Sequence, residues 1–237
     1  MKKELMSGLL ACALAWPVAA VSADARGDEI SQTGQPRSWD VRGAPFENPG
    51  FHGARWGMSM DEVKAVVAAA WPEAPATARL QFDAAARTTA LAITVPTLAP
   101  GPGPAEISYV FGAAGKRLVA VHQTWTIPGN PGDVQRTALM RNATTLAGEL
   151  VGYQWPEFAT TRGRVTAPGE LILFAGRDFN GGGVEIRVGG VSLDVELPGA
   201  VRKVEHRAAP AGPAHLRKSL VASIGHPDIY SIPPGAF

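Results

Sequence analysis

The pattern of apolar residues predicts two helices in this chain. The first begins at Ser59, where Ser59 as N-cap and Glu62 three residues later form a capping box. Apolar residues then recur at helical spacing as far as Trp71, and the following proline ends the run because proline cannot continue a helix. The second helix is expected over 133–151, where leucine and alanine residues form one stripe and Gly152 provides a C-terminal stop.

Alternation of apolar and polar residues predicts strands in the remaining segments. Strands are expected at 80–82, 91–95, 107–111, 119–127, 171–174, 184–188 and 191–197. Gly189-Gly190 is typical of a two-residue hairpin turn, because both positions of a type I′ turn need a positive φ. This turn would pair the last two strands, place Glu185 opposite Asp194 and allow Arg187 to bridge the two carboxylates.

Two stretches of the sequence are similar to each other. Trp71 begins WPEAPATAR and Trp155 begins WPEFATTRGR, and each stretch directly follows a predicted helix. In each half a Glu-Ile pair, at Glu106 and at Glu185, opens the last hairpin. A Trp-Pro helix stop explains the dipeptide but not the shared glutamate, threonine and arginine. We therefore expect an α+β fold of two pseudo-repeats, each with a helix and antiparallel strands, forming one sheet with both helices on one face.

The chain divides by composition and pattern into further segments. Residues 24–50 are rich in Gly, Pro, Ser, Asp and Arg, which is typical of a mobile arm. The two repeats are expected over 51–130 and 131–200. Residues 201–237 are expected to form a Pro- and Ala-rich segment, a short helix over 213–224 and a C-terminal tail.

The N-terminus has the features of an export signal. Two lysines precede a largely apolar stretch, and small residues allow cleavage after Ala23. The sequence therefore predicts a signal peptide over 1–23 and a periplasmic or secreted location. The alternative is a lipoprotein signal in which Cys12, the only cysteine, carries the lipid. No later stretch approaches the ~20 continuous apolar residues of a membrane-spanning helix, so no transmembrane segment is expected in the mature protein.

Composition argues against several classes of function. Removal of residues 1–23 takes two lysines and one glutamate from 22 basic and 21 acidic residues, leaving 20 of each and no cysteine. A net charge near zero provides no electrostatic basis for binding nucleic acid or an anionic membrane. Without cysteine, disulfides, thiolate metal sites and a cysteine nucleophile are excluded. No hydrolase, nucleotide-binding or histidine-ligand motif occurs, so we predict no catalytic residue, metal ligand or cofactor.

The segment Arg55-Trp56-Gly57-Met58-Ser59-Met60-Asp61-Glu62-Val63 resembles the start of small exported bacterial α+β domains. These are of the β-lactamase-inhibitor-like and small outer-membrane lipoprotein (SmpA-like) type, in which a short strand leads into a capped helix. In inhibitor-like members, tandem helix-plus-sheet repeats form a concave sheet that grips a partner protein. The resemblance covers this segment and the repeat architecture, and it implies a protein-binding sheet face.

The candidate site is the sheet face opposite the predicted core. The residues expected there are His122, Thr124, Thr126, Arg187, Asp194 and Glu196. We expect this face to bind a protein partner in the cell envelope, as an inhibitor, an adaptor or an assembly factor.

Two other classes of function remain open. A small ligand or a metal ion would use the same face, where Glu185, Asp194 and Glu196 supply carboxylates. An enzyme would bring an acid and a base together only in the fold, for instance Glu106 with His122. A concave cleft with buried carboxylates would favour these two classes, whereas a broad, shallow face with exposed apolar residues would favour a protein partner.

Overall fold

The structure is a computed structural model that describes residues 43–101, 103–197 and 203–230, excepting the side chains of residues 196, 197 and 203. The predicted signal peptide, residues 24–42 of the predicted arm and the last part of the predicted tail lie outside the described residues.

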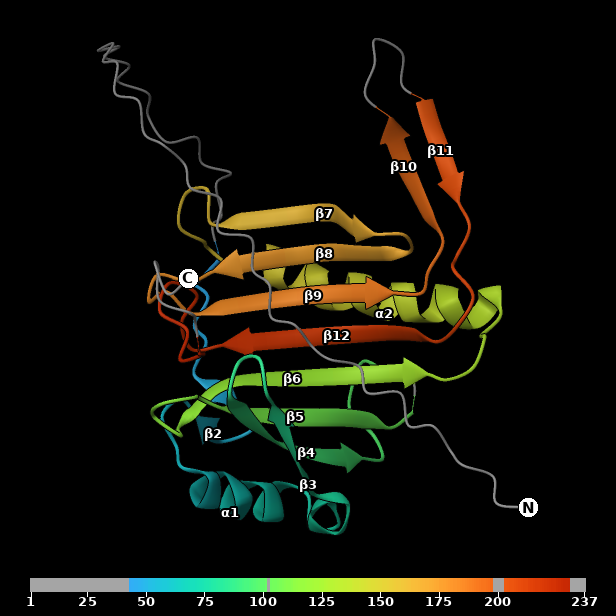
Figure 1. The fold of residues 1–237 in the computed structure, drawn as a ribbon. Coiled ribbons are helices and arrows are strands. Elements are labelled where there is room, and N and C mark those ends of the chain that lie inside the picture. The colour runs from blue at the N-terminus through green and yellow to red at the C-terminus, as the bar shows by residue number, and fades with distance from the viewer. Residues whose placement is uncertain (1–42, 102, 198–202, 231–237) are drawn as a thin grey trace, which may run out of the picture. The chain divides into compact units, whose positions relative to one another are not determined.

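Most strands form one antiparallel sheet of eight strands (Figure 1). In the order of the sheet, the strands are β3 (Arg79–Asp83), β4 (Thr88–Val95), β5 (Ala105–Phe111), β6 (Leu118–Ile127), β12 (Ala214–Val221), β9 (Gly183–Gly189), β8 (Glu170–Arg177) and β7 (Thr160–Ala167). Two further pairs are β1 (Gly50–Phe51) with β2 (Ala54–Arg55), and β10 (Leu193–Leu197) with β11 (Lys203–Arg207). The β10–β11 hairpin stands apart from the eight-stranded sheet in Figure 1.

Two α-helices complete this mixed, sheet-dominated fold over the described residues, and the helices predicted after Ser59 and over 133–151 are confirmed. Helix α1 spans Met60–Ala70; Ser59 Oγ accepts a hydrogen bond from Glu62 N, and the Glu62 carboxylate accepts one from Ser59 N at 2.7 Å. A short 3₁₀ helix, η1 (Ala74–Thr77), follows it. Helix α2 spans Asp133–Val151 and lies behind β8, β9 and β12 in Figure 1. Among the described residues, no helix is long and apolar enough to cross a membrane.

One buried hydrophobic cluster contains residues of both helices and of the strands. The stripe that α2 buries consists of Leu139, Ala143, Leu146, Ala147 and Leu150. The fully buried indole of Trp125 donates from Nε1 to the carbonyl oxygen of Leu98 at 2.8 Å. A Cβ at Gly101 would lie 1.9 Å from that indole, so only glycine allows this loop to cover it.

The predicted hairpin at Gly189-Gly190 is wrong. Strand β9 pairs with β8 on one side and β12 on the other, so neither of its edges is free for β10. Strand β10 pairs with β11 instead, and Asp194 lies opposite His206 rather than Glu185. The two glycines indicated that the chain reverses direction into a paired strand, but the position beside β9 is taken by β12, which comes later in the sequence than β10.

The short helix predicted over 213–224 is also wrong, because these residues form the central strand β12 and its exit. Leu216 and Leu220 are four residues apart, which imitates a helical stripe. The register places Lys218 between them on the core side, opposite Gln123 of β6. An apolar residue at this position would have shown the alternation of a strand; lysine concealed it.

The predicted arm is ordered by contacts over 43–50, so a mobile arm that extends to residue 50 is wrong there. The ring of Phe46 stacks on Trp155 with centroids 4.7 Å apart. Asn48 Nδ2 donates to the carbonyl oxygens of Gly183 at 3.1 Å and Val221 at 2.9 Å. Its polar composition suggested mobility, but Phe46 fastens the segment to the stretch after α2, and Asn48 fastens it to the ends of β9 and β12.

We expect Asn48→Asp to destabilise the fold by about 2 kcal/mol at neutral pH, because a carboxylate would face two carbonyl oxygens without a proton to donate. Urea denaturation measures the free energy of unfolding. The control is Asn180→Asp at an exposed loop position, which should stay within about 0.5 kcal/mol of wild type. Equal effects of the two variants would contradict a clamping role for Asn48.

Candidate functional site

Polar side chains collect on the side of the central strands that faces away from the core. The polar sheet face is formed by Ser108 of β5, His122, Thr124 and Thr126 of β6, His215, Arg217 and Ser219 of β12, Glu185 and Arg187 of β9, and Glu170 of β8. Their positions alternate along each strand with those of the core residues. The face thus draws its residues from both halves of the chain.

Four of the predicted site residues lie on this face. Thr124 and Arg187 flank Arg217 of β12 in one row across the sheet. His122 lies one row away and Thr126 lies one row to the other side, where its side chain is exposed. The structure therefore places these four residues close together, with β12 between the strands that carry them.

The other two predicted residues do not lie on this face. Asp194 belongs to β10, where its Oδ1 lies 2.8 Å from Nδ1 of His206, and both side chains are about 70% exposed. Glu196 lies in the same strand, and its side chain is outside the described part of the chain. Their assignment to the sheet face depended on the β9–β10 hairpin and fails for the same reason.

His122 is buried on the polar sheet face, with 8% of its surface exposed. Its Nδ1 lies 3.0 Å from the hydroxyl oxygen of Ser219. Burial, aided by the positive charge of Arg217, lowers the pKa of His122 to about 3. The imidazole is therefore neutral at physiological pH, and it forms a hydrogen bond with Ser219 instead of acting as an acid.

Arg187 is held between two carboxylates. Its Nε donates to Glu185 Oε1 at 2.8 Å and a terminal nitrogen donates to Glu185 Oε2 at 3.2 Å, while the other terminal nitrogen binds Glu170. Arg217 approaches Glu185 Oε1 to 4.0 Å. Burial alone would raise the pKa of Glu170, but hydrogen bonds from Thr166 and Arg187 keep it below its ordinary value. The predicted bridge from Arg187 is thus confirmed for Glu185, whereas its second carboxylate is Glu170.

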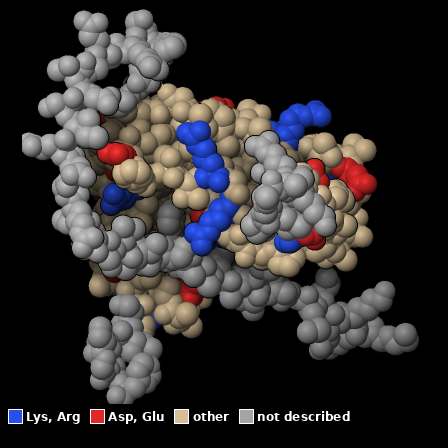
Figure 2. Space-filling view, turned by 90° about the horizontal axis from the view of Figure 1, so that it is seen from above, with Lys and Arg blue, Asp and Glu red and all other residues tan. Residues whose placement is uncertain are grey.

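The structure does not join the acid and base considered for an enzyme. Glu106 binds Arg79 and accepts a 3.4 Å hydrogen bond from Ser108, whereas His122 binds Ser219. Nor do three His, Cys, Asp or Glu side chains gather to hold a metal ion anywhere in the described ranges. Seen from above in Figure 2, basic and acidic side chains are scattered over a mostly uncharged surface.

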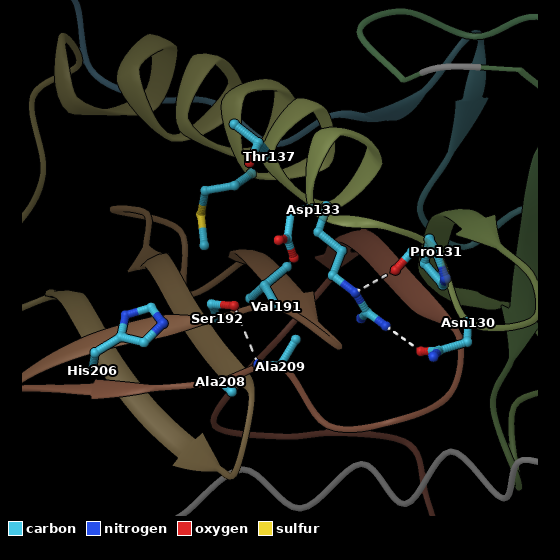
Figure 3. Close-up of a pocket in the computed structure, with 11 residues that line it drawn as sticks. Asn130, Pro131, Asp133, Thr137, Val191, Ser192, His206, Ala208 and Ala209 are labelled. Carbon is cyan, nitrogen blue, oxygen red and sulfur yellow. Dashed lines mark hydrogen bonds between the residues drawn. The ribbon is translucent and has the colours of Figure 1, made fainter.

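A cavity of about 590 Å³ lies between the start of α2 and the base of the β10–β11 hairpin. Its lining consists of Asn130, Pro131, Asp133, Arg136, Thr137, Met140, Val191, Ser192, His206, Ala208 and Ala209. Figure 3 shows Asp133 and Thr137 on α2 across the cavity from His206 and Ser192. Asp133 and Thr137 are four residues apart and so share one helix face.

Arg136 organises the wall of this cavity. Its Nε donates to Pro131 O at 2.8 Å, and a terminal nitrogen donates to Asn130 Oδ1 at 2.7 Å (Figure 3). The same terminal nitrogen also donates to Gly212 O at 3.2 Å. The other terminal nitrogen binds the carbonyl oxygen of Gly190. This buried guanidinium thus ties together three loops through neutral oxygens. The sequence did not reveal the cavity because the residues of its walls are distant along the chain. The four-residue spacing of Asp133 and Thr137, which places two polar side chains on one face of the predicted helix, was the only indication of it.

Comparison of the chain with protein-family models, with curated proteins and with solved structures finds no match.

The buried neutral state of His122 predicts acid destabilisation. Its pKa is 6.5 unperturbed and about 3 when folded, so the unfolded chain binds the proton more tightly. Stability should therefore decrease as pH falls from 6.5 towards 3, with a contribution of up to about 1.4 kcal/mol per pH unit. Denaturation at several pH values should show that His122→Gln removes this part of the slope. The exposed His226→Gln should retain it, and an unchanged slope in His122→Gln would contradict the assignment.

Proposed function

We propose that this chain is an exported protein-binding module, which docks on a partner protein of the cell envelope through its polar sheet face. The observation that best supports this proposal is the network of Arg187 with Glu185 and Glu170. In this network the Arg187 side chain is 22% exposed and the Glu170 side chain is 28% exposed. Arginine is enriched in protein interfaces and among their energetically dominant residues. A guanidinium already fixed by carboxylates loses little further side-chain entropy when a partner binds.

The surroundings of this network favour a macromolecular partner. No described helix or strand lies in front of β9 and β12 in Figure 1, whereas α2 lies behind them. Ala175, a small and partly exposed residue of β8, shares the face with the network, so that a partner backbone can approach the longer side chains there. The signal peptide predicted over 1–23 is the basis for placing the interaction in the periplasm or outside the cell.

We also infer that the two halves are structural repeats. Helix α1 precedes β3, β4, β5 and β6, and α2 precedes β7, β8, β9 and β12. The sheet order is symmetric about the β6–β12 junction. Val63 and Val67 of α1 share one buried cluster with the α2 stripe, which supports both helices covering the core face. This arrangement accords with the resemblance to inhibitor-like domains and leaves the polar sheet face for a partner.

The cavity beside α2 supports a second candidate function, the binding of a small polar ligand. Its volume of about 590 Å³ falls within the ordinary range for ligand sites. Asp133, Thr137 and Ser192 offer a carboxylate and two hydroxyls, and Met140 with Val191 offers apolar contact. A ligand of this class would carry hydroxyl or amine donors on a small apolar frame.

Filling the cavity should test this second function. A compound that binds there should raise the melting temperature of the wild type, and Thr137→Trp should abolish the increase by occupying the space. Thr145→Trp, at an exposed α2 position outside the cavity lining, is the matched control and should respond like wild type. Stabilisation that persists in Thr137→Trp would place the compound elsewhere.

Photo-crosslinking in intact cells tests the proposed protein partner. A photoreactive residue at exposed Thr126 should yield one discrete adduct with a different protein, identified by mass spectrometry. The same residue at Arg141, exposed on α2, is the control and should not yield that adduct. Arg187→Lys should reduce the yield several-fold, because lysine cannot form the bidentate contact. No adduct from Thr126, or equal adducts from both positions, would refute docking through the polar sheet face.

A further inference from the structure

One edge of the eight-stranded sheet carries exposed apolar side chains. Strand β3 is an end strand of the sheet and, within the described part of the chain, pairs only with β4. Its side chains from Arg79 to Phe82 are all exposed, with Leu80 at 61% and Phe82 at 66%. An end strand presents backbone N–H and C=O groups that can pair with another strand, so this edge has both the hydrogen-bonding groups and the apolar area for association.

The sequence of β3, Arg-Leu-Gln-Phe-Asp, is complementary to itself in antiparallel register. If two copies pair with Gln81 opposite Gln81, Arg79 of each copy faces Asp83 of the other. In the same register Leu80 faces Phe82, so each apolar residue meets an apolar residue. Opposite charges and aromatic–aliphatic pairs are the cross-strand combinations that stabilise antiparallel strands.

We propose that two copies of this chain associate through β3, in antiparallel register about Gln81. The contact is isologous, with the same surface on both copies, and it therefore closes as a dimer instead of propagating as a fibre. The two sheets become one continuous sheet. Because each copy contributes only five residues, the dimer is reversible and forms with increasing protein concentration.

Local contacts hold both charged ends of β3 in the single copy. Asp83 Oδ1 accepts hydrogen bonds from the N–H groups of Ala85 and Ala86, both at 2.9 Å, which fixes the carboxylate at the start of the turn. Arg79 is oriented by its ion pair with Glu106 of β5, and its side chain remains 47% exposed. Asp83 is thus held at the edge before a second copy arrives, whereas Arg79 must turn from Glu106, which lies on β5 beyond β4, towards Asp83 of the other copy.

The opposite edge of the sheet does not offer the same template. Strand β7 contains Gly163 with φ +63°, and its pairing with β8 is irregular between Val165 and Ala167. Its charged residues, Arg162 and Arg164, are both basic, so no register pairs opposite charges across two copies. Association through the sheet edge is therefore specific to β3.

Cysteine crosslinking tests the register. Directly opposite residues of antiparallel strands have Cα atoms about 4.5 or 5.5 Å apart, which is within disulfide range. Under mild oxidation, Gln81→Cys should give a covalent dimer in high yield. Thr161→Cys, exposed on β7, is the matched control. Wild type treated with the same oxidant measures any crosslinking through Cys12, the only natural cysteine. Crosslinking of Gln81→Cys no greater than that of Thr161→Cys would overturn the proposed register.

Sedimentation velocity over a concentration series tests the association itself. Wild type should shift towards a dimer, and Phe82→Lys should weaken the association at least about tenfold by placing two charges in the apolar pairs. Phe179→Lys, at a residue 55% exposed outside β3, should associate like wild type. Wild type that stays monomeric at its highest soluble concentration, or a dimer indifferent to Phe82→Lys, would overturn the proposal. The polar sheet face is intact in these variants, so a failure here is distinct from a failure of partner binding there.

Discussion

The pairing of β12 with β6 and β9 is the constraint on which the rest of this structure depends. Strand β12 pairs with β6 from Ala214 to Val221 on one side and with β9 on the other. The strands on its two sides come from different halves of the chain, so the sheet is continuous only because β12 lies between them. Its core-side leucines also join the cluster that both helices share.

The polar sheet face is a direct result of this insertion. Ser219 supplies the hydroxyl that meets His122 of β6, and Arg217 brings a second guanidinium towards Glu185 of β9. Without β12, the polar residues of β6 and those of β9 would not belong to one face, because no strand would join the two halves of the sheet. The pKa of His122 reports the assembled state, because both its burial and its cationic neighbour depend on the neighbouring strand.

What the sequence could predict depended on whether the information was local. The capping box at Ser59 and the glycine after residue 151 act within a few residues, so the bounds of both helices could be predicted. Strand β7 could not, because its side chains are nearly all exposed and so show no alternation. The Arg187–Glu185 contact follows from spacing along one strand, whereas Glu170 and the cavity walls required knowledge of which strands become neighbours.

The position of β12 in the sequence has a consequence for biogenesis. It follows every other strand of the sheet, yet it occupies the middle, so its pairing with β6 closes a loop of nearly ninety residues. A ribosome, which releases the chain from its N-terminus, delivers the central strand last. Until then the inner edges of β6 and β9 are unsatisfied, so the eight-stranded sheet is completed only when the last of its strands arrives.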